Sequence, residues 1–132
     1  MDGNIKGLHH AAIKLCGTEE YKKALAFYRD VLGLEVLREW GEGANSACML
    51  GTGRGRVELF ANAQSGLPQG NIRHLAFDVR DTDALCAAVS AAGYEVFDGP
   101  RDVMIPSDPP YPARIAFCRG PAGEEIEFFC EK

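Results

Sequence analysis

Residues 8–15, LHHAAIKL, predict a β-strand in which every second residue, Ala11, Ile13 and Leu15, forms an apolar side toward a core. Apolar side chains then recur at helical spacing, and the period predicts an amphipathic helix over residues 18–32. Thr18 is the expected N-cap of this helix, and Gly33 is expected to end it. Three strand-like runs follow between glycine-rich turns: LEVLREW, NSACMLG and RVELFAN.

The second half of the chain repeats this order of elements. Strand IRHLAFDV precedes an alanine-rich helix that Asp81 and Thr82 cap and Gly93 ends, and strand YEVF follows. The proline-rich residues 99–112 predict a long loop, and strands ARIAFCR and EEIEFFCE close the chain. The repeat predicts one α+β domain of two paired βαβββ modules, with these ranges: module 8–62, linker 63–71 and module 72–131.

Two histidines and two glutamates occupy matching positions in the two halves. His10 and His74 lie in the first strand of each half, and Glu58 and Glu127 lie in the last. By strand alternation, each of these residues falls on the mixed face of its strand, opposite the apolar face that packs on the helices. We therefore expect the two mixed faces to line a shared hollow.

The chemistry of these four side chains indicates a metal site. Two imidazoles and two carboxylates suit a divalent ion such as Ni, Co, Zn, Mn or Fe, whereas Mg or Ca would favour oxygen ligands alone. The alternative is that the histidines are hydrogen-bonded structural residues and the glutamates lie on a solvated face. His9 points away from His10 in a regular strand, so we assign it a structural role on the helix-packing side or at its edge.

Composition narrows the class of partner. The net charge of -5 and the pI near 5.2 argue against nucleic acid or an anionic membrane and leave a small-molecule substrate as the default. The five cysteines are scattered without zinc-ligand spacing, which favours free thiols in a reducing, cytoplasmic setting. The first residues, MDGNIKG, lack the apolar stretch of a signal peptide, and no run is long enough for a membrane helix.

Several stretches resemble the vicinal oxygen chelate superfamily, also called the glyoxalase/bleomycin-resistance family. The matching stretches are LHHAAIKL, AFYRDVLGLEV, RVELF, RHLAFDV with the following DTDAL, and PAGEEIEFF. The resemblance implies paired βαβββ modules that curl into a cup-shaped mixed sheet. It also implies one divalent metal ion held by His10, Glu58, His74 and Glu127, and a homodimer whose four ligands come from one chain or from two.

Retention of all four ligands is similar to the glyoxalase I and methylmalonyl-CoA epimerase branches, and the leading comparison is the glyoxalase I branch. That resemblance implies a lyase or isomerase that shifts a proton through a metal-bound enediolate of an α-oxo-aldehyde thiol adduct. Glu127 would be the catalytic base, and Glu58 could act on the opposite face. Asn62 matches a glutathione contact of that branch, whereas Lys14 stands where the branch usually carries Arg and cannot offer the bidentate fork of a guanidinium.

Two other functions stay open at this point. An acyl-CoA epimerase similar to methylmalonyl-CoA epimerase would use both glutamates, and a bleomycin-resistance type of binding protein would have an apolar, metal-free cup. The expected loop at residues 102–112 either covers the cup and excludes water or is a rigid surface connection.

Overall fold

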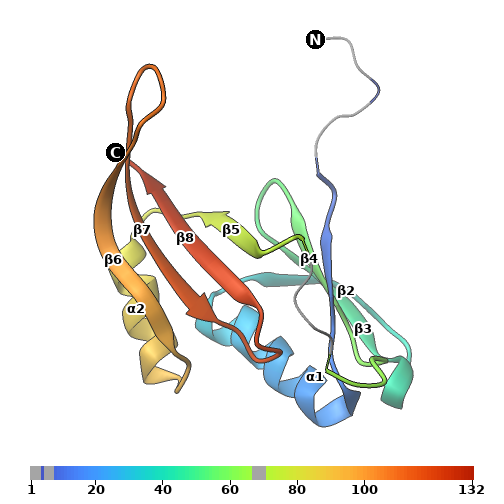
Figure 1. Ribbon diagram of the computed structural model, residues 1–132. Helices are drawn as coiled ribbons and strands as arrows, with labels where there is room; N and C mark the ends of the chain where they lie inside the picture. The colour runs from blue at the N-terminus through green and yellow to red at the C-terminus, as the bar shows by residue number, and fades with distance from the viewer. Residues whose placement is uncertain (1–3, 5–7, 67–70) are drawn as a thin grey trace. The chain divides into compact units, whose positions relative to one another are not determined.

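The protein is described here by a computed structural model, which covers Asn4, residues 8–66 and residues 71–132 (Figure 1). The chain forms two compact units, residues 1–66 and residues 67–132. The expected linker at 63–71 lies partly outside the described residues. Each unit contains one four-stranded mixed sheet and one α-helix, so the predicted α+β fold with paired βαβββ modules is confirmed.

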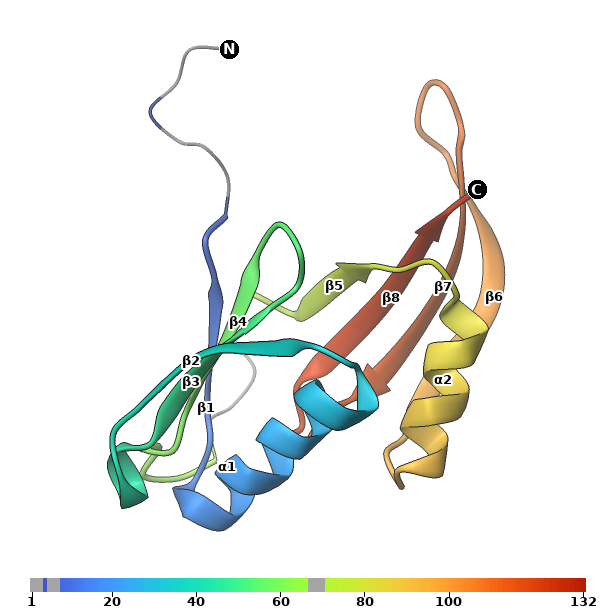
Figure 2. The ribbon, with the colours of Figure 1, turned by 180° about the vertical axis from the view of Figure 1, so that it is seen from behind.

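The first unit has the strand order β1-β4-β3-β2, in which β1 pairs parallel with β4 and the other pairs are antiparallel. Helix α1 packs against one face of this sheet (Figure 2). Tyr21 and Ala24 of the helix, Phe27 and Tyr28 of the π-helical turn that follows it, and Leu59 of the sheet are buried. The elements are β1 (Ala11–Lys14), α1 (Gly17–Ala26), a π-helical turn (Phe27–Val31), β2 (Glu35–Trp40), a 3-10 turn (Gly43–Asn45), β3 (Ala47–Gly51) and β4 (Arg56–Phe60).

Helix α1 begins one residue before the expected start, so the prediction of Thr18 as N-cap is wrong. Cys16 is the capping residue, and its amide donates to a Glu20 carboxylate oxygen at 3.1 Å. The Gly17 amide donates to the carbonyl of Ala61 at 3.1 Å, so the end of β4 satisfies the first free amide of the helix. The expected helix span ends in the π-helical turn, and Gly33 follows it with a positive φ of 77°.

The second unit has the same order of strands, β5-β8-β7-β6, with β5 parallel to β8. Asp81 caps α2 as expected, because its carboxylate accepts a hydrogen bond from the Ala84 amide at 2.9 Å. Gly93 follows the helix with a positive φ of 90°. The elements are β5 (His74–Asp78), α2 (Thr82–Ala91), β6 (Val96–Ile105), β7 (Tyr111–Arg119) and β8 (Glu125–Glu131).

The long loop expected at residues 99–112 is wrong, because β6 and β7 extend through most of it as a hairpin. Residues 102–105 and 111–112, which were expected to belong to a loop that either covers the cup or connects the surface, are paired strand residues, and 106–110 connect them. Prolines are tolerated here because β6 is an edge strand and its pairing is irregular between Asp98 and Arg101. Gly99 (φ 85°) fits this irregularity because a Cβ there would lie 2.6 Å from the carbonyl oxygen of Ile115.

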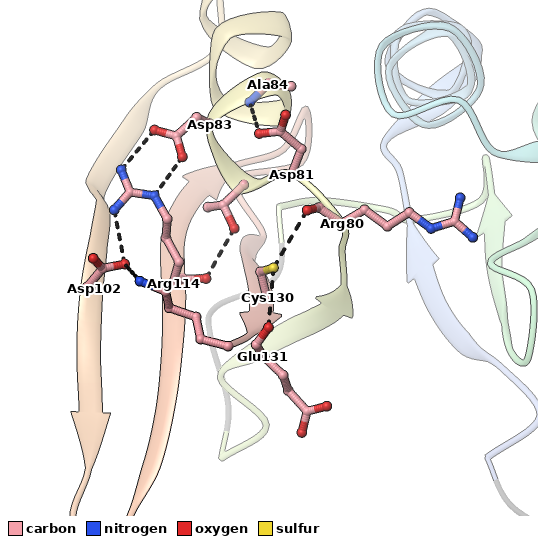
Figure 3. Close-up of polar contacts among 10 residues, drawn as sticks. Arg80, Asp81, Asp83, Ala84, Asp102, Arg114, Cys130 and Glu131 are labelled. Carbon is pink, nitrogen blue, oxygen red and sulfur yellow. Dashed lines mark hydrogen bonds and ion pairs between the residues drawn. The ribbon is translucent and has the colours of Figure 1, made fainter.

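A cluster of ion pairs joins α2 to the sheet of the second unit (Figure 3). Arg114 of β7 donates to both carboxylate oxygens of Asp83 at 2.6 and 2.9 Å, and to Asp102 of β6 at 3.2 Å. Lys132 also contacts Asp102, at 3.1 Å, and the Thr82 hydroxyl donates to the Arg114 carbonyl. The bidentate geometry orients α2 on the face opposite to that of His74.

All five cysteines are free thiols, and Cys48, Cys86 and Cys118 are buried. Burial raises the pKa of Cys118 to about 12, so this thiol is held in its unreactive protonated form. Within the described residues, neither the length nor the hydropathy of any helix is sufficient to cross a bilayer.

We expect Arg114→Gln to lower the melting temperature near neutral pH and to have less effect in acid. Arg114 holds the pKa of Asp83 below its usual range, as Lys132 and Arg114 do for Asp102. Carboxyl groups with a lowered pKa stabilise the fold above their ordinary value of about 3.9, and this stabilisation is lost as the pH falls through the lowered value. Thermal unfolding from about pH 7 to about pH 2.5 measures the difference in melting temperature between wild type and variant, and Arg38→Gln in β2 is the control. A difference that does not change with pH would contradict the role of these ion pairs.

Candidate functional site

The first unit brings His10 and Glu58 together. His10 immediately precedes β1, and Glu58 lies at the centre of β4, where it pairs in register with Ala12. His10 Nε2 is 3.4 Å from Glu58 Oε1, with the histidine side chain 37% exposed and the glutamate side chain 9% exposed. The predicted partners within the first half are therefore neighbours.

The second unit repeats this arrangement with His74 and Glu127. His74 begins β5, and Glu127 of β8 pairs in register with Ala76. His74 Nε2 is 3.2 Å from Glu127 Oε1, and the exposures are again unequal, at 39% and 12%. In both units a parallel ladder places the glutamate opposite an alanine that follows the histidine by two residues. His74 lies within its ladder, so alternation places it on the face of Glu127, whereas His10 lies just before its ladder and its contact with Glu58 shows that it reaches the same face.

Glu58 and Glu127 are the buried charged residues of the part of the chain that the structure describes. A buried carboxylate is costly without a compensating partner, and in each unit the partner within reach is a histidine nitrogen. Among the ion pairs of the described residues, Glu58 and Glu127 each pair with a histidine and not with an arginine or a lysine.

The nitrogen–oxygen distances suit two ligands of one cation. Two atoms bound to a metal ion at about 2.1 Å are about 3.0 Å apart in octahedral geometry and about 3.4 Å apart in tetrahedral geometry. The observed separations of 3.4 and 3.2 Å fall at this spacing. Each unit thus presents a nitrogen–oxygen pair of suitable type and spacing, although no three His, Cys, Asp or Glu side chains form a group across residues 8–66 and 71–132.

The prediction that the side chains of His9 and His10 point to opposite faces is wrong. His9 is exposed, and its Nδ1 lies 2.9 Å from Nδ1 of His10. Alternation of side chains applies within a paired ladder, and β1 begins only at Ala11, so residues 9 and 10 lie before the regular part of the strand.

Lys14 and Asn62, the predicted substrate-contacting residues, lie near the C-terminal ends of β1 and β4. Lys14 is exposed and pairs in register with Phe60, which places it on the same face as Glu58. Asn62 is exposed and forms an isolated bridge with Cys16. The geometry leaves both accessible to a solute.

Aromatic residues flank each histidine–glutamate pair, and those of the second unit, Phe97 and Phe117, were not singled out from the sequence. The edge of the Phe117 ring contacts His74, with centroids 5.3 Å apart, and Phe117 pairs in register with Glu127. Phe97 contacts Phe117, and the Arg119 guanidinium lies 4.3 Å from the Phe97 ring centroid. The alternation of apolar residues in β7 gives the face of Phe117 but not its cross-strand partner, so this cluster could be found only once the register was known.

In the first unit the aromatic neighbours are Trp40 and Phe60. Phe60 follows Glu58 by two residues on the same face of β4, and its ring is 6.2 Å from that of Trp40, which is 42% exposed. The face that carries the first pair is therefore partly apolar, as is common beside small-molecule sites.

The family comparison agrees with this architecture. The model of the Glyoxalase/Bleomycin resistance protein/Dioxygenase superfamily matches residues 7–128. No curated protein matches the chain. The structure of SMU.1112c is similar at 25% identity and a TM-score of 0.73, over 96% of this chain and 99% of that one.

Two further solved structures have different descriptions but the same fold. The lactoylglutathione lyase from Agrobacterium tumefaciens is 21% identical, with a TM-score of 0.67 over 97% of this chain and 96% of that one. TnmS3, an antibiotic binding protein from Streptomyces sp. CB03234, is also 21% identical, with a TM-score of 0.69 over 98% of this chain and 100% of that one. At this identity the likeness shows the fold alone, so function must be argued from the residues.

We expect Phe60→Ala to shift the fluorescence emission of Trp40 to longer wavelength. Removal of the Phe60 ring takes away a contact of the half-exposed indole and admits water to it. Trp40 is the one tryptophan of the chain, so the emission reports this face alone. Phe97→Ala in the second unit is the control, and an unchanged spectrum for Phe60→Ala would contradict the contact.

Proposed function

Because this chain belongs to the glyoxalase/bleomycin resistance protein/dioxygenase superfamily, we propose that it is a divalent-metal-dependent lyase or isomerase of glyoxalase I type. The observation that carries the proposal is the repeated histidine–glutamate pair, His10 with Glu58 and His74 with Glu127, at 3.4 and 3.2 Å. Members of the superfamily generally bind a divalent metal, and they include enzymes such as lactoylglutathione lyase.

The proposed ligands of one metal ion are His10, Glu58, His74 and Glu127. The two pairs come either from one chain or from two copies in a homodimer. Their mixture of imidazole and carboxylate donors favours Ni, Co or Zn, with Mn or Fe as alternatives. When bound, such an ion polarises a substrate carbonyl and stabilises the negative charge that develops on its oxygen.

Glu127 is the proposed base. Its carboxylate removes a proton from the carbon next to a polarised carbonyl and returns it to the adjacent carbon, which isomerises an adduct of an α-oxo-aldehyde and a thiol. The position of Glu127 supports this role, because its carboxylate is buried in the sheet and lies 3.2 Å from His74, beside the proposed metal ion. Glu58 is the corresponding group from the first unit.

Lys14 is the proposed contact for an acidic group of the thiol. An ammonium attracts a carboxylate as a point charge but does not form the paired hydrogen bonds of a guanidinium. The proposed substrate is therefore an adduct whose thiol part need not be glutathione. Asn62 supplies an exposed amide close to the same end of the sheet.

We expect the purified chain to bind about one Ni, Co or Zn ion per set of four ligands. His10→Ala and His74→Ala should each weaken binding by more than about 100-fold, since loss of a ligand costs more than loss of its hydrogen-bonded supports. Isothermal titration calorimetry and elemental analysis measure affinity and stoichiometry. Failure of the wild-type chain to bind any of these ions would overturn the proposal, and binding that survives one substitution would remove that residue from the ligand set.

We expect Glu127→Gln to abolish turnover of methylglyoxal with a thiol while the chain stays folded. Gln preserves the size of the side chain but cannot accept a proton, so the rate should fall by about 10²–10⁴-fold or more. The assay uses metal-loaded protein and several thiols, with circular dichroism as the check of folding and the exposed Glu35→Gln of β2 as matched control. Turnover by Glu127→Gln at the wild-type rate would refute the role of Glu127. If the wild-type chain instead exchanges the α-proton of an acyl-CoA in the absence of thiol, the result would point to an epimerase.

A further inference from the structure

His9 and His10 are in contact immediately before β1. Their Nδ1 atoms are 2.9 Å apart, and their rings meet edge to face with centroids separated by 5.2 Å and planes inclined by 85°. The other ring nitrogen of His10, Nε2, is the atom that lies 3.4 Å from Glu58. Both nitrogens of His10 are therefore occupied, one by His9 and one on the side of the proposed metal ion.

We propose that His9 is a positioning residue, which holds the His10 ring with Nε2 toward Glu58 and free to bind a cation. The inference rests on the proposed function in one respect, namely that His10 is a metal ligand. His9 itself is not assigned as a ligand, since its Nδ1 is directed at His10.

The distribution of protons explains how His9 acts. A neutral imidazole carries one N–H, so a histidine that binds metal through Nε2 must carry its proton on Nδ1. The Nδ1–H of His10 then donates to Nδ1 of His9, which accepts it and keeps its own proton on Nε2. In the reverse arrangement His9 donates, and the His10 proton sits on Nε2, facing the Glu58 carboxylate and closed to a metal.

A second-shell partner of this kind fixes both the ring orientation and the tautomer of a metal-binding histidine, and its removal typically costs about 10–100-fold in metal affinity. Here the partner is a neighbouring residue in the chain, so the support is local to residues 9 and 10. The partner must also accept a hydrogen bond from His10, which histidine or asparagine at position 9 can do and an apolar residue of similar size cannot.

The second unit supports its histidine differently. Arg73 occupies the position before His74, and the ring that contacts His74 is that of Phe117 from β7. The two histidines therefore occupy matching positions in the repeat but have different neighbours. Replacement of His9 should accordingly affect His10 and leave His74 unchanged, which makes His74 an internal control.

The test compares His9→Leu with His9→Asn in the full chain. Leu removes the acceptor, whereas the side-chain amide of Asn places a hydrogen-bonding atom close to the position of Nδ1. We expect His9→Leu to weaken zinc binding by about 10–100-fold and His9→Asn to bind within about threefold of wild type, as measured by calorimetry. Equal affinity of His9→Leu and wild type would overturn the proposal, and so would equal weakening by both substitutions, which would instead identify His9 as a direct ligand.

A second readout works without metal. Long-range proton–nitrogen NMR spectra of the metal-free chain at about pH 8.5, where free imidazole is neutral, report the tautomer and hydrogen bonding of each histidine ring. We expect the His10 nitrogen shifts to change in His9→Leu and to be retained in His9→Asn, with the His74 shifts constant. Unchanged His10 shifts in His9→Leu would overturn the positioning role. If the wild-type chain binds no metal, the proposed metal-dependent function is wrong, but altered His10 shifts in His9→Leu would still support the positioning role of His9.

Discussion

The parallel pairing of the first and last strand within each module is the constraint on which the candidate site depends. In β1–β4 the register sets Ala12 opposite Glu58, and in β5–β8 it sets Ala76 opposite Glu127. Each alanine is small and follows its histidine by two residues, so it leaves room for the imidazole to reach the carboxylate. A slip of one residue would turn the glutamate to the helix-packed face and break the pair.

Burial gives this pairing its chemical importance. Each glutamate sits at the centre of a sheet, where a charge is unfavourable unless a partner or a cation compensates it. The same desolvation that makes the carboxylates costly would strengthen their interaction with a metal ion. The fold itself does not decide between enzyme and binding protein, because both occur on it; the ionisable pairs are what favour chemistry here.

The two modules share their register but differ in the residues around it. Met49 lies opposite Glu58, whereas Phe117 lies opposite Glu127. His10 contacts His9, whereas His74 contacts Phe117. The two histidine–glutamate pairs therefore have the same register but unlike surroundings.

The sequence by itself determined the repeat, the strand faces, and the correspondence of His10 with His74 and of Glu58 with Glu127, because periodicity and spacing are local properties of the chain. Only the tertiary structure decided the features that depend on a partner strand: the hairpin that replaces the loop at residues 99–112, the start of α1 at Gly17, and the contact of Phe117 with His74. The meeting of His9 with His10 was likewise hidden, since alternation predicts opposite faces and the ladder begins only at Ala11. Alternation assigns a side chain to a face, whereas the register between strands decides which side chains on that face meet.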